Sequence, residues 1–161
     1  MVPAAPERES GVSFIARRTG PDIRFQSIPR GAEPGRLMVG RDGMVHLFWA
    51  IRGDGLHYSR YEGGKWVSLG QVADLEWDRV PWYGPDRLGV VQTPDGRLYL
   101  FLMDKVLSRV GEGWEVVHTV NDFYYPILAK VRIAVGPDGV VHVLYSGDLG
   151  ERYMHEGRIQ A

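Results

Sequence analysis

Three aspartates follow apolar stretches of similar sequence and are the first candidates for chemistry. Asp54 follows "FWAIRG", Asp104 follows "LYLFLM" and Asp148 follows "VHVLYSG". Carboxyl groups gathered at one end of a fold can bind a cation or act as an acid and base pair in glycoside hydrolysis. Aspartate is also a common turn residue, and this structural role is the favoured interpretation. The three are therefore candidate catalytic residues, and none is assigned.

Two longer stretches concentrate aromatic side chains beside charged residues: "DLEWDRVPWYGPD" at 74–86 and "NDFYYPILAK" at 121–130. An aromatic ring can stack on the apolar face of a sugar while charged groups bind the sugar hydroxyls. The stretches offer a candidate ligand-binding surface on loops, although packing between sheets or subunits is the favoured use of the same aromatics. The candidate ligand-binding residues are Trp77, Trp82, Tyr83, Tyr124, Tyr125 and Arg52.

Several kinds of chemistry are excluded by residue types. The chain has no cysteine, which removes thiol catalysis, thiolate metal sites and disulfides. His46 and His142 share one position of a repeated segment in which another copy has Tyr99, so we expect packing rather than metal binding there. No nucleotide-binding loop, zinc-protease motif or nucleophile elbow is present. The sequence therefore indicates no cofactor and no metal.

The charge balance argues against two classes of partner. Nineteen basic and twenty acidic residues give a net charge of −1, which disfavours nucleic-acid binding. No apolar run approaches the about 18 residues of a membrane span, and the stretch "MVPAAPERESG" lacks the layout of a secretory signal. We expect a soluble protein without a membrane partner, and the cytoplasm is slightly favoured as its location.

The elements that must position these residues are strands. The chain has 21 glycines and 10 prolines, which oppose helix interiors and suit short strands joined by tight turns. The segments "DGMVHLFWA", "DGRLYLFLM" and "DGVVHVLYS" recur along the chain, at a spacing of roughly 40 to 55 residues that is typical of propeller blades. The expected strands are 36–40, 44–50, 56–61 and 65–72, then 87–91, 97–103, 105–110 and 114–120, then 131–135, 140–146 and 152–157.

The two ends of the repeat pattern are complementary. Residues 14–29 resemble the last two strands of a unit, whereas the third unit has no evident fourth strand. A strand from the first segment is expected to complete that unit, and three twisted sheets are too few to surround an axis. We therefore predict a flexible segment at 1–11 and one half-propeller domain at 12–161, with two chains forming a six-bladed ring. A fragment of a longer propeller and an open stack of sheets are the alternatives.

The stretch "SRYEGGKW" resembles the Asp-box, or BNR, repeat of sialidase-like propellers. Ser59, Gly63 and Trp66 fall on the positions of that motif, while Tyr61 and Lys65 stand where it has Asp and Thr. The resemblance implies a β-propeller of the sialidase-like superfamily. Sialidases of this superfamily use an arginine triad whose first member lies in an Arg-Ile-Pro motif.

The sialidase residues are not carried across. In "QSIPRG", Ser27 stands at the position of the first arginine, and the triad has no residue-by-residue match. The expected function is a non-enzymatic, homodimeric propeller module that binds a carbohydrate or a protein partner through its aromatic loops. The alternatives are a sialidase-like glycoside hydrolase or lyase that uses the loop aspartates, and a purely structural scaffold that assembles with itself.

Overall fold

The computed structural model describes residues 14–19, 22–27, 32–74, 88–102, 104–119, 131–146 and 154–159. All regular structure in these ranges is strand, so the all-β class expected from the sequence is confirmed. The search of the same ranges for an apolar helix of membrane-spanning length finds none. The strands are β1 (Phe14–Thr19), β2 (Asp22–Ser27), β3 (Ala32–Val39), β4 (Val45–Ile51), β5 (Gly55–Glu62), β6 (Lys65–Ala73), β7 (Gly89–Gln92), β8 (Leu98–Leu102), β9 (Lys105–Val110), β10 (Gly113–Thr119), β11 (Val131–Val135), β12 (Val141–Ser146) and β13 (Met154–Ile159).

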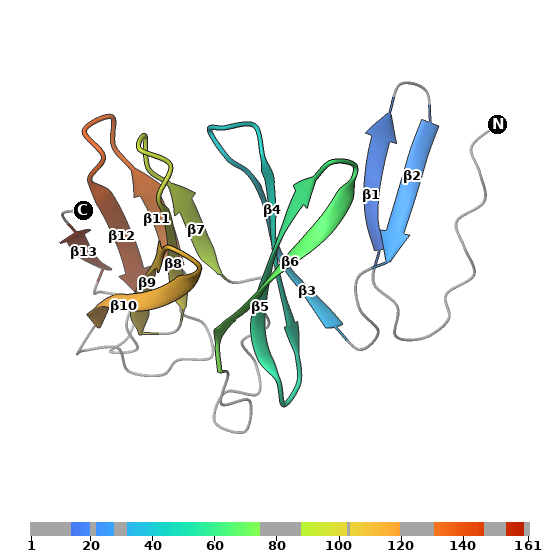
Figure 1. Cartoon of the computed structure of the whole chain (residues 1–161). Helices are drawn as coiled ribbons and strands as arrows, with labels where there is room; N and C mark the ends of the chain where they lie inside the picture. The colour runs from blue at the N-terminus through green and yellow to red at the C-terminus, as the bar shows by residue number, and fades with distance from the viewer. Residues whose placement is uncertain are drawn as a thin grey trace.

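The strands form four antiparallel sheets in which neighbours in sequence are neighbours in space (Figure 1). We call β3–β6 the first sheet, β7–β10 the second and β11–β13 the third; β1 and β2 form a separate pair. The strands expected from the repeat match these sheets closely, except that β3 begins four residues earlier than expected and β13 lies two residues later. Each sheet is thus one repeat unit folded on itself through short hairpins.

The same Asp-Gly turn joins the first two strands of the first, second and third sheets. Gly43, Gly96 and Gly139 have φ values of 77°, 88° and 81°, in the left-handed region that glycine adopts without strain. In the first sheet, the carboxylate of Asp42 accepts a hydrogen bond of 2.9 Å from the backbone NH of Met44. The corresponding aspartates of the other two turns accept the same bond. The repeat read in the sequence is therefore a repeat of backbone geometry.

Aromatic packing joins the first sheet to the second. Phe48 and Tyr58 are fully buried on the face of the first sheet that meets the second. Trp114 of β10 lies edge-on to both rings, with centroid distances of 5.8 Å. Edge-to-face aromatic contacts of this kind add to the free energy gained by burial.

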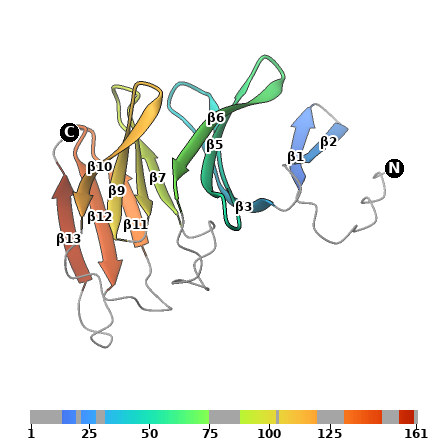
Figure 2. The same cartoon turned by 60° about the horizontal axis from the view of Figure 1, so that its bottom comes forward.

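A smaller apolar cluster joins the second sheet to the third, and the three sheets stand face to face in a row (Figure 2). Along the strands of the second sheet, residues that face the first sheet therefore alternate with residues that face the third. The cluster consists of Tyr99, Phe101, Val106, Val141 and Val143.

The row of sheets is not closed within one copy of the chain. Among the described strands, β13 pairs with β12 alone, and β1 and β2 pair only with each other. The β1–β2 pair lies beside the first sheet, and β13 lies at the opposite end of the molecule (Figures 1 and 2). The expected closure by an N-terminal strand is therefore not made inside one copy.

Replacing Trp114 by alanine tests the packing between the first two sheets. We expect Trp114→Ala to lower the free energy of unfolding by about 3 kcal/mol, because a large ring is removed from a packed seam. Urea denaturation followed by circular dichroism measures the change. The control is Val116→Ala on the same strand, whose side chain is half exposed and whose loss should cost within about 0.5 kcal/mol. Equal effects of the two changes would contradict this account of the seam.

Candidate functional site

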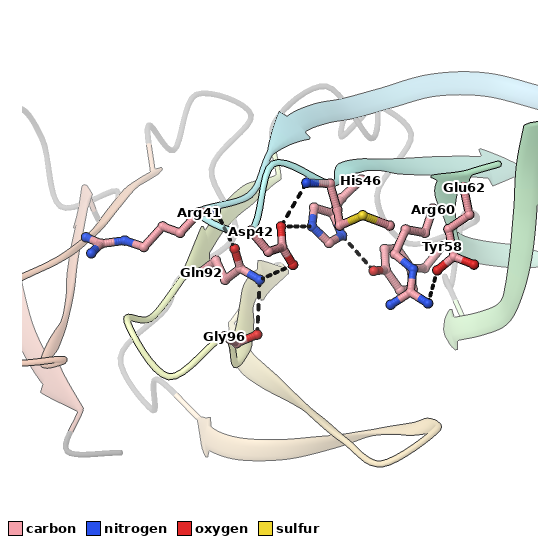
Figure 3. Close-up of polar contacts among 9 residues, drawn as sticks. Arg41, Asp42, His46, Tyr58, Arg60, Glu62, Gln92 and Gly96 are labelled. Atoms are coloured by element: carbon pink, nitrogen blue, oxygen red, sulfur yellow. Dashed lines mark hydrogen bonds and ion pairs between the residues drawn. The ribbon is translucent and has the colours of Figure 1, made fainter. Parts of the chain in front are cut away.

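A polar pocket of about 290 Å³ opens between the first and second sheets, at the end that carries the Asp-Gly turns. Both sheets contribute side chains to it, so the pocket exists only because the two sheets pack together. Figure 3 shows the polar contacts around it. The lining residues are Asp42, His46, Tyr58, Arg60, Gln92, Gly96, Arg97, Leu98, Arg109 and Gly111.

Two arginines reach this pocket from opposite sides because of a one-residue difference in register. In the first sheet Arg60 lies opposite His46, whereas in the second sheet Ser108 lies opposite Tyr99, the repeat counterpart of His46. Residues directly opposite in an antiparallel pair share a face, and neighbours along a strand alternate faces. Arg60 therefore faces the second sheet, while Arg109 faces the first.

A contact of Arg109 confirms that this guanidinium group faces the first sheet. The guanidinium carbon of Arg109 lies 4.7 Å from the centre of the Tyr58 ring, a cation–π contact across the seam. Arg60 forms an ion pair with Glu62 of its own strand. The Nε atom of Arg60 is buried and, within the described part of the chain, has no hydrogen-bond partner. Buried donors without a partner are uncommon in folded proteins, so this atom calls for an explanation.

Gln92 of β7 ties the two turns at the pocket's edge. Its Oε1 accepts a 2.6 Å hydrogen bond from the backbone NH of Arg41, in the turn of the first sheet. Its Nε2 donates to the carboxylate of Asp42 at 3.3 Å and to the carbonyl of Gly96 at 3.1 Å. One side chain therefore fixes the relative position of the turns from both sheets.

His46 is almost fully buried at the back of the pocket. Its Nδ1 lies 2.7 Å from the Tyr58 hydroxyl, and its Nε2 lies 3.8 Å from Oδ1 of Asp42. Burial lowers the pKa of His46, although the nearby Asp42 carboxylate opposes the shift. Burial raises the pKa of Tyr58, so the phenol keeps its proton at neutral pH and shares a hydrogen bond with Nδ1.

Asp42 stays ionised at neutral pH. Burial pushes its pKa upward, but hydrogen bonds from the Met44 backbone and from Gln92 outweigh burial, so the pKa lies below its usual value. The pocket therefore presents one carboxylate acceptor together with the guanidinium donors of Arg60, Arg97 and Arg109.

The three described candidates from the sequence lie at the opposite end of the sheets. Arg52 is exposed and Asp54 follows it in the β4–β5 hairpin, while Asp104 lies in the β8–β9 hairpin. Asp54 accepts a hydrogen bond from His57 at 3.1 Å, and its backbone carbonyl accepts one from Gln71 at 2.6 Å. Those contacts are typical of a residue that shapes a turn. Within the described ranges, no cluster of three metal-ligating side chains is found.

The aromatic loops are not tested by the structure, and their expected role stays a prediction. The candidates that lie outside the described residues are Trp77, Trp82, Tyr83, Tyr124, Tyr125 and Asp148.

The arginine pair of the seam is absent from the candidates derived from sequence. Arg60 and Arg109 each follow a serine in similar segments, "SRYEGGKW" and "SRVGEGW", so an alignment of the repeats makes them equivalent. Equivalent residues of a repeat face equivalent sides of their sheets, so the alignment predicts that the two arginines lie in two different seams rather than in one shared pocket. The sequence feature that distinguishes the two arginines is the number of residues between the Ser-Arg pair and the next tryptophan. This number is one smaller in "SRVGEGW" than in "SRYEGGKW".

Comparison with known proteins adds little to this geometry. No protein-family model and no curated protein sequence matches the chain, so the Asp-box resemblance has no support from family comparison. The chain is similar in structure to a fucose lectin from Kordia zhangzhouensis in complex with methyl-fucoside. The identity is 12%, the TM-score is 0.44, and the match covers 80% of this chain and 92% of the lectin.

Gly40 is the residue most sensitive to added volume at this site. A Cβ atom there would lie 2.5 Å from Oδ1 of Asp42, 2.5 Å from Oε1 of Gln92 and 2.7 Å from Nε2 of His46. We expect Gly40→Ala to lower the free energy of unfolding by about 1–3 kcal/mol, because these three polar groups must move apart. The control is Gly113→Ala, where the nearest atom would be 3.9 Å away. A chemical denaturation curve for each variant decides, and equal stabilities would refute the tight packing.

Protonation of His46 should destabilise the protein below neutral pH. Its pKa is lower in the folded than in the unfolded chain, so the unfolded state binds more protons as the pH falls below about 6.5. The free energy of unfolding should therefore decline from that pH downward, and His46→Gln should flatten the decline. The matched control is His118→Gln, which changes an exposed histidine of β10. The measurement is urea denaturation at a series of pH values, and a slope unchanged by His46→Gln would contradict the assignment.

Proposed function

We propose that this chain is a non-enzymatic module that binds a carbohydrate in the pocket between its first and second sheets. The proposal treats the sheets as blades of a β-propeller. The observation that carries it is the convergence of the Arg60 and Arg109 guanidinium groups with the Asp42 carboxylate in one pocket of about 290 Å³.

The chemistry of the pocket suits a ligand that is rich in hydroxyl groups. A sugar hydroxyl both donates and accepts, so it can accept from a guanidinium and donate to the Asp42 carboxylate at once. Hydrogen bonds with a charged partner are the stronger class, and the planar guanidinium holds two neighbouring oxygens in a fixed geometry. The volume lies near the lower end of small-molecule sites, which begin at about 300 Å³. A single sugar ring is the natural size of ligand.

The same pocket favours binding over hydrolysis. Glycoside hydrolysis normally uses two carboxyl groups that flank the scissile bond. Of the described residues that line the pocket, Asp42 alone carries a carboxyl group. The sialidase-like alternative would therefore need the loop aspartates at the other end of the sheets.

The propeller architecture requires more sheets than one copy supplies. Propellers have about four to eight blades, and the described chain has three sheets of three or four strands. The proposed module is a homodimer whose two copies together form a six-bladed ring. The seam pocket lies between two sheets of one copy, so ligand binding does not depend on this assembly.

Loss of either arginine should weaken binding. A glycan array identifies a bound sugar, and calorimetry with its methyl glycoside gives the Kd. We expect Arg60→Ala and Arg109→Ala each to raise the Kd about tenfold or more, because each removes a charged hydrogen-bond donor worth about 1.5–3 kcal/mol. Arg36→Ala is the charge-matched control, since Arg36 is exposed on β3 and does not line the pocket.

Two results would contradict the proposed function. A folded wild-type chain that retains no glycan on the array would exclude carbohydrate as the ligand. A glycan whose Kd is unchanged by both arginine variants would place the site elsewhere, with the aromatic loops as the next surface to test. A protein ligand would be shown by retention of protein rather than glycan.

A further inference from the structure

On the outer face of the first sheet, Leu47 and Trp49 of the central strand β4 are buried. The rest of this face, which we define by Leu37, Val39, Tyr61 and Trp66, is not covered by another sheet among the described strands of the same copy. We infer that this outer face docks against the third sheet of a second copy of the chain. The inference goes beyond the ligand site, because it assigns the surface through which copies meet.

Comparison with the second sheet shows that the equivalent face of the neighbouring repeat is covered by another sheet. Leu37 and Val39 occupy the same register positions in the first sheet as Val90 and Gln92 in the second. Val90 and Gln92 are 8% and 7% exposed, because the first sheet covers them. Leu37 and Val39 are 50% and 68% exposed. Apolar residues left uncovered at positions that the neighbouring repeat buries mark an interaction surface.

The opposite end of the row shows the complementary vacancy. Met38 of the first sheet and Val91 of the second face the next sheet in the row, and both are half-buried. The equivalent residue of the third sheet, Ala134, is exposed. His142, which lies opposite Ala134, is also more exposed than its buried counterpart Tyr99. Within the described part of the chain, the row of sheets therefore has one partly uncovered face at each end, and the two faces are of the kinds that pack together inside the chain.

The outer face differs in chemistry from the seam that holds the pocket. At the pocket the second sheet presents Arg109 and Gln92, whereas the first sheet presents Tyr61 and Val39 at the same register positions. Tyr61 packs edge-on against Trp66, with ring centroids 5.2 Å apart. An apolar and aromatic face suits burial against protein, because the hydrophobic core of an interface is depleted of charge.

The unpaired edges among the described strands favour a second copy of the chain as the partner that covers the outer face. The β1–β2 pair stands on the same side as the outer face, and the third sheet ends at the unpaired edge of β13 among the described strands (Figure 2). Exposed sheet edges pair readily with further strands, so an incomplete sheet of one copy can join that of another. Two copies give six sheets, within the about four to eight of known propellers, whereas three copies exceed that range.

The cross-link that tests this inference uses a contact already present inside the chain. Gln92 Nε2 lies 3.3 Å from Oδ2 of Asp42, and the repeat counterparts of these residues are Val39 and Asp138. The docked faces should therefore bring Val39 of one copy close to Asp138 of the other. Because the chain has no cysteine, Val39→Cys and Asp138→Cys place the only two thiols at this junction.

We expect an oxidised mixture of the Val39→Cys and Asp138→Cys proteins to give a covalent dimer on a non-reducing gel, while each protein alone stays at 18.1 kDa. Light scattering of the unmodified chain should give about twice 18.1 kDa. The substitution Val39→Glu should return that mass to the monomer value. Val116→Glu, which changes another half-exposed valine at 52%, should leave the dimer intact. The sheet signal in circular dichroism confirms that each variant is folded.

Three results would overturn the inference. The first is a monomeric mass of the unmodified chain at all concentrations, and the second is a mass above that of two copies. The third is the absence of a specific cross-link between the mixed cysteine proteins. If Val39→Glu fails to fold, the cross-link decides alone. A protein that is monomeric but still binds a glycan would refute the docking and leave the proposed function standing.

Discussion

The packing of Trp114 against Phe48 and Tyr58 is the contact on which the site depends. It holds the second sheet on the first, and the polar pocket occupies the same seam closer to the turns. The apolar part of the seam excludes water and sets the spacing of the sheets. The polar part contains two buried nitrogen atoms, Nε of Arg60 and Nε2 of His46, that have no hydrogen-bond partner among the described residues. Their desolvation is tolerated because aromatic burial in the same seam offsets it.

Side chains alternate between the two faces of a strand, and this alternation determines which polar groups enter the seam. A shift of one residue in pairing moves a side chain to the other face of the sheet. The segments around Arg60 and Arg109 are similar in sequence, yet their registers differ by one residue, so the two guanidinium groups meet in one pocket. A small change of hairpin length thus converts a repeated structural segment into a binding site, while other faces of the repeat stay apolar.

Much of the fold was accessible from sequence, because Asp-Gly turns and alternating apolar runs act locally. The three repeats, their strands and the two-stranded N-terminal pair were predicted from these signals. The seam pocket was not, because it depends on pairing register and on which residues face each other between sheets. Asp54, singled out as a carboxylate, instead bonds within its own hairpin. The aromatic loops and the ring of two copies stay predictions.

The most direct test of the central claim is one nitrogen–proton NMR spectrum that resolves arginine Nε and tryptophan Nε1 signals, recorded with and without a bound glycan. We predict that the Arg60 and Arg109 signals shift together on saturation, while that of Arg36 does not. Shifts confined to Trp77 and Trp82, with both pocket arginines unchanged, would contradict a site between the sheets and would place the ligand on the aromatic loops.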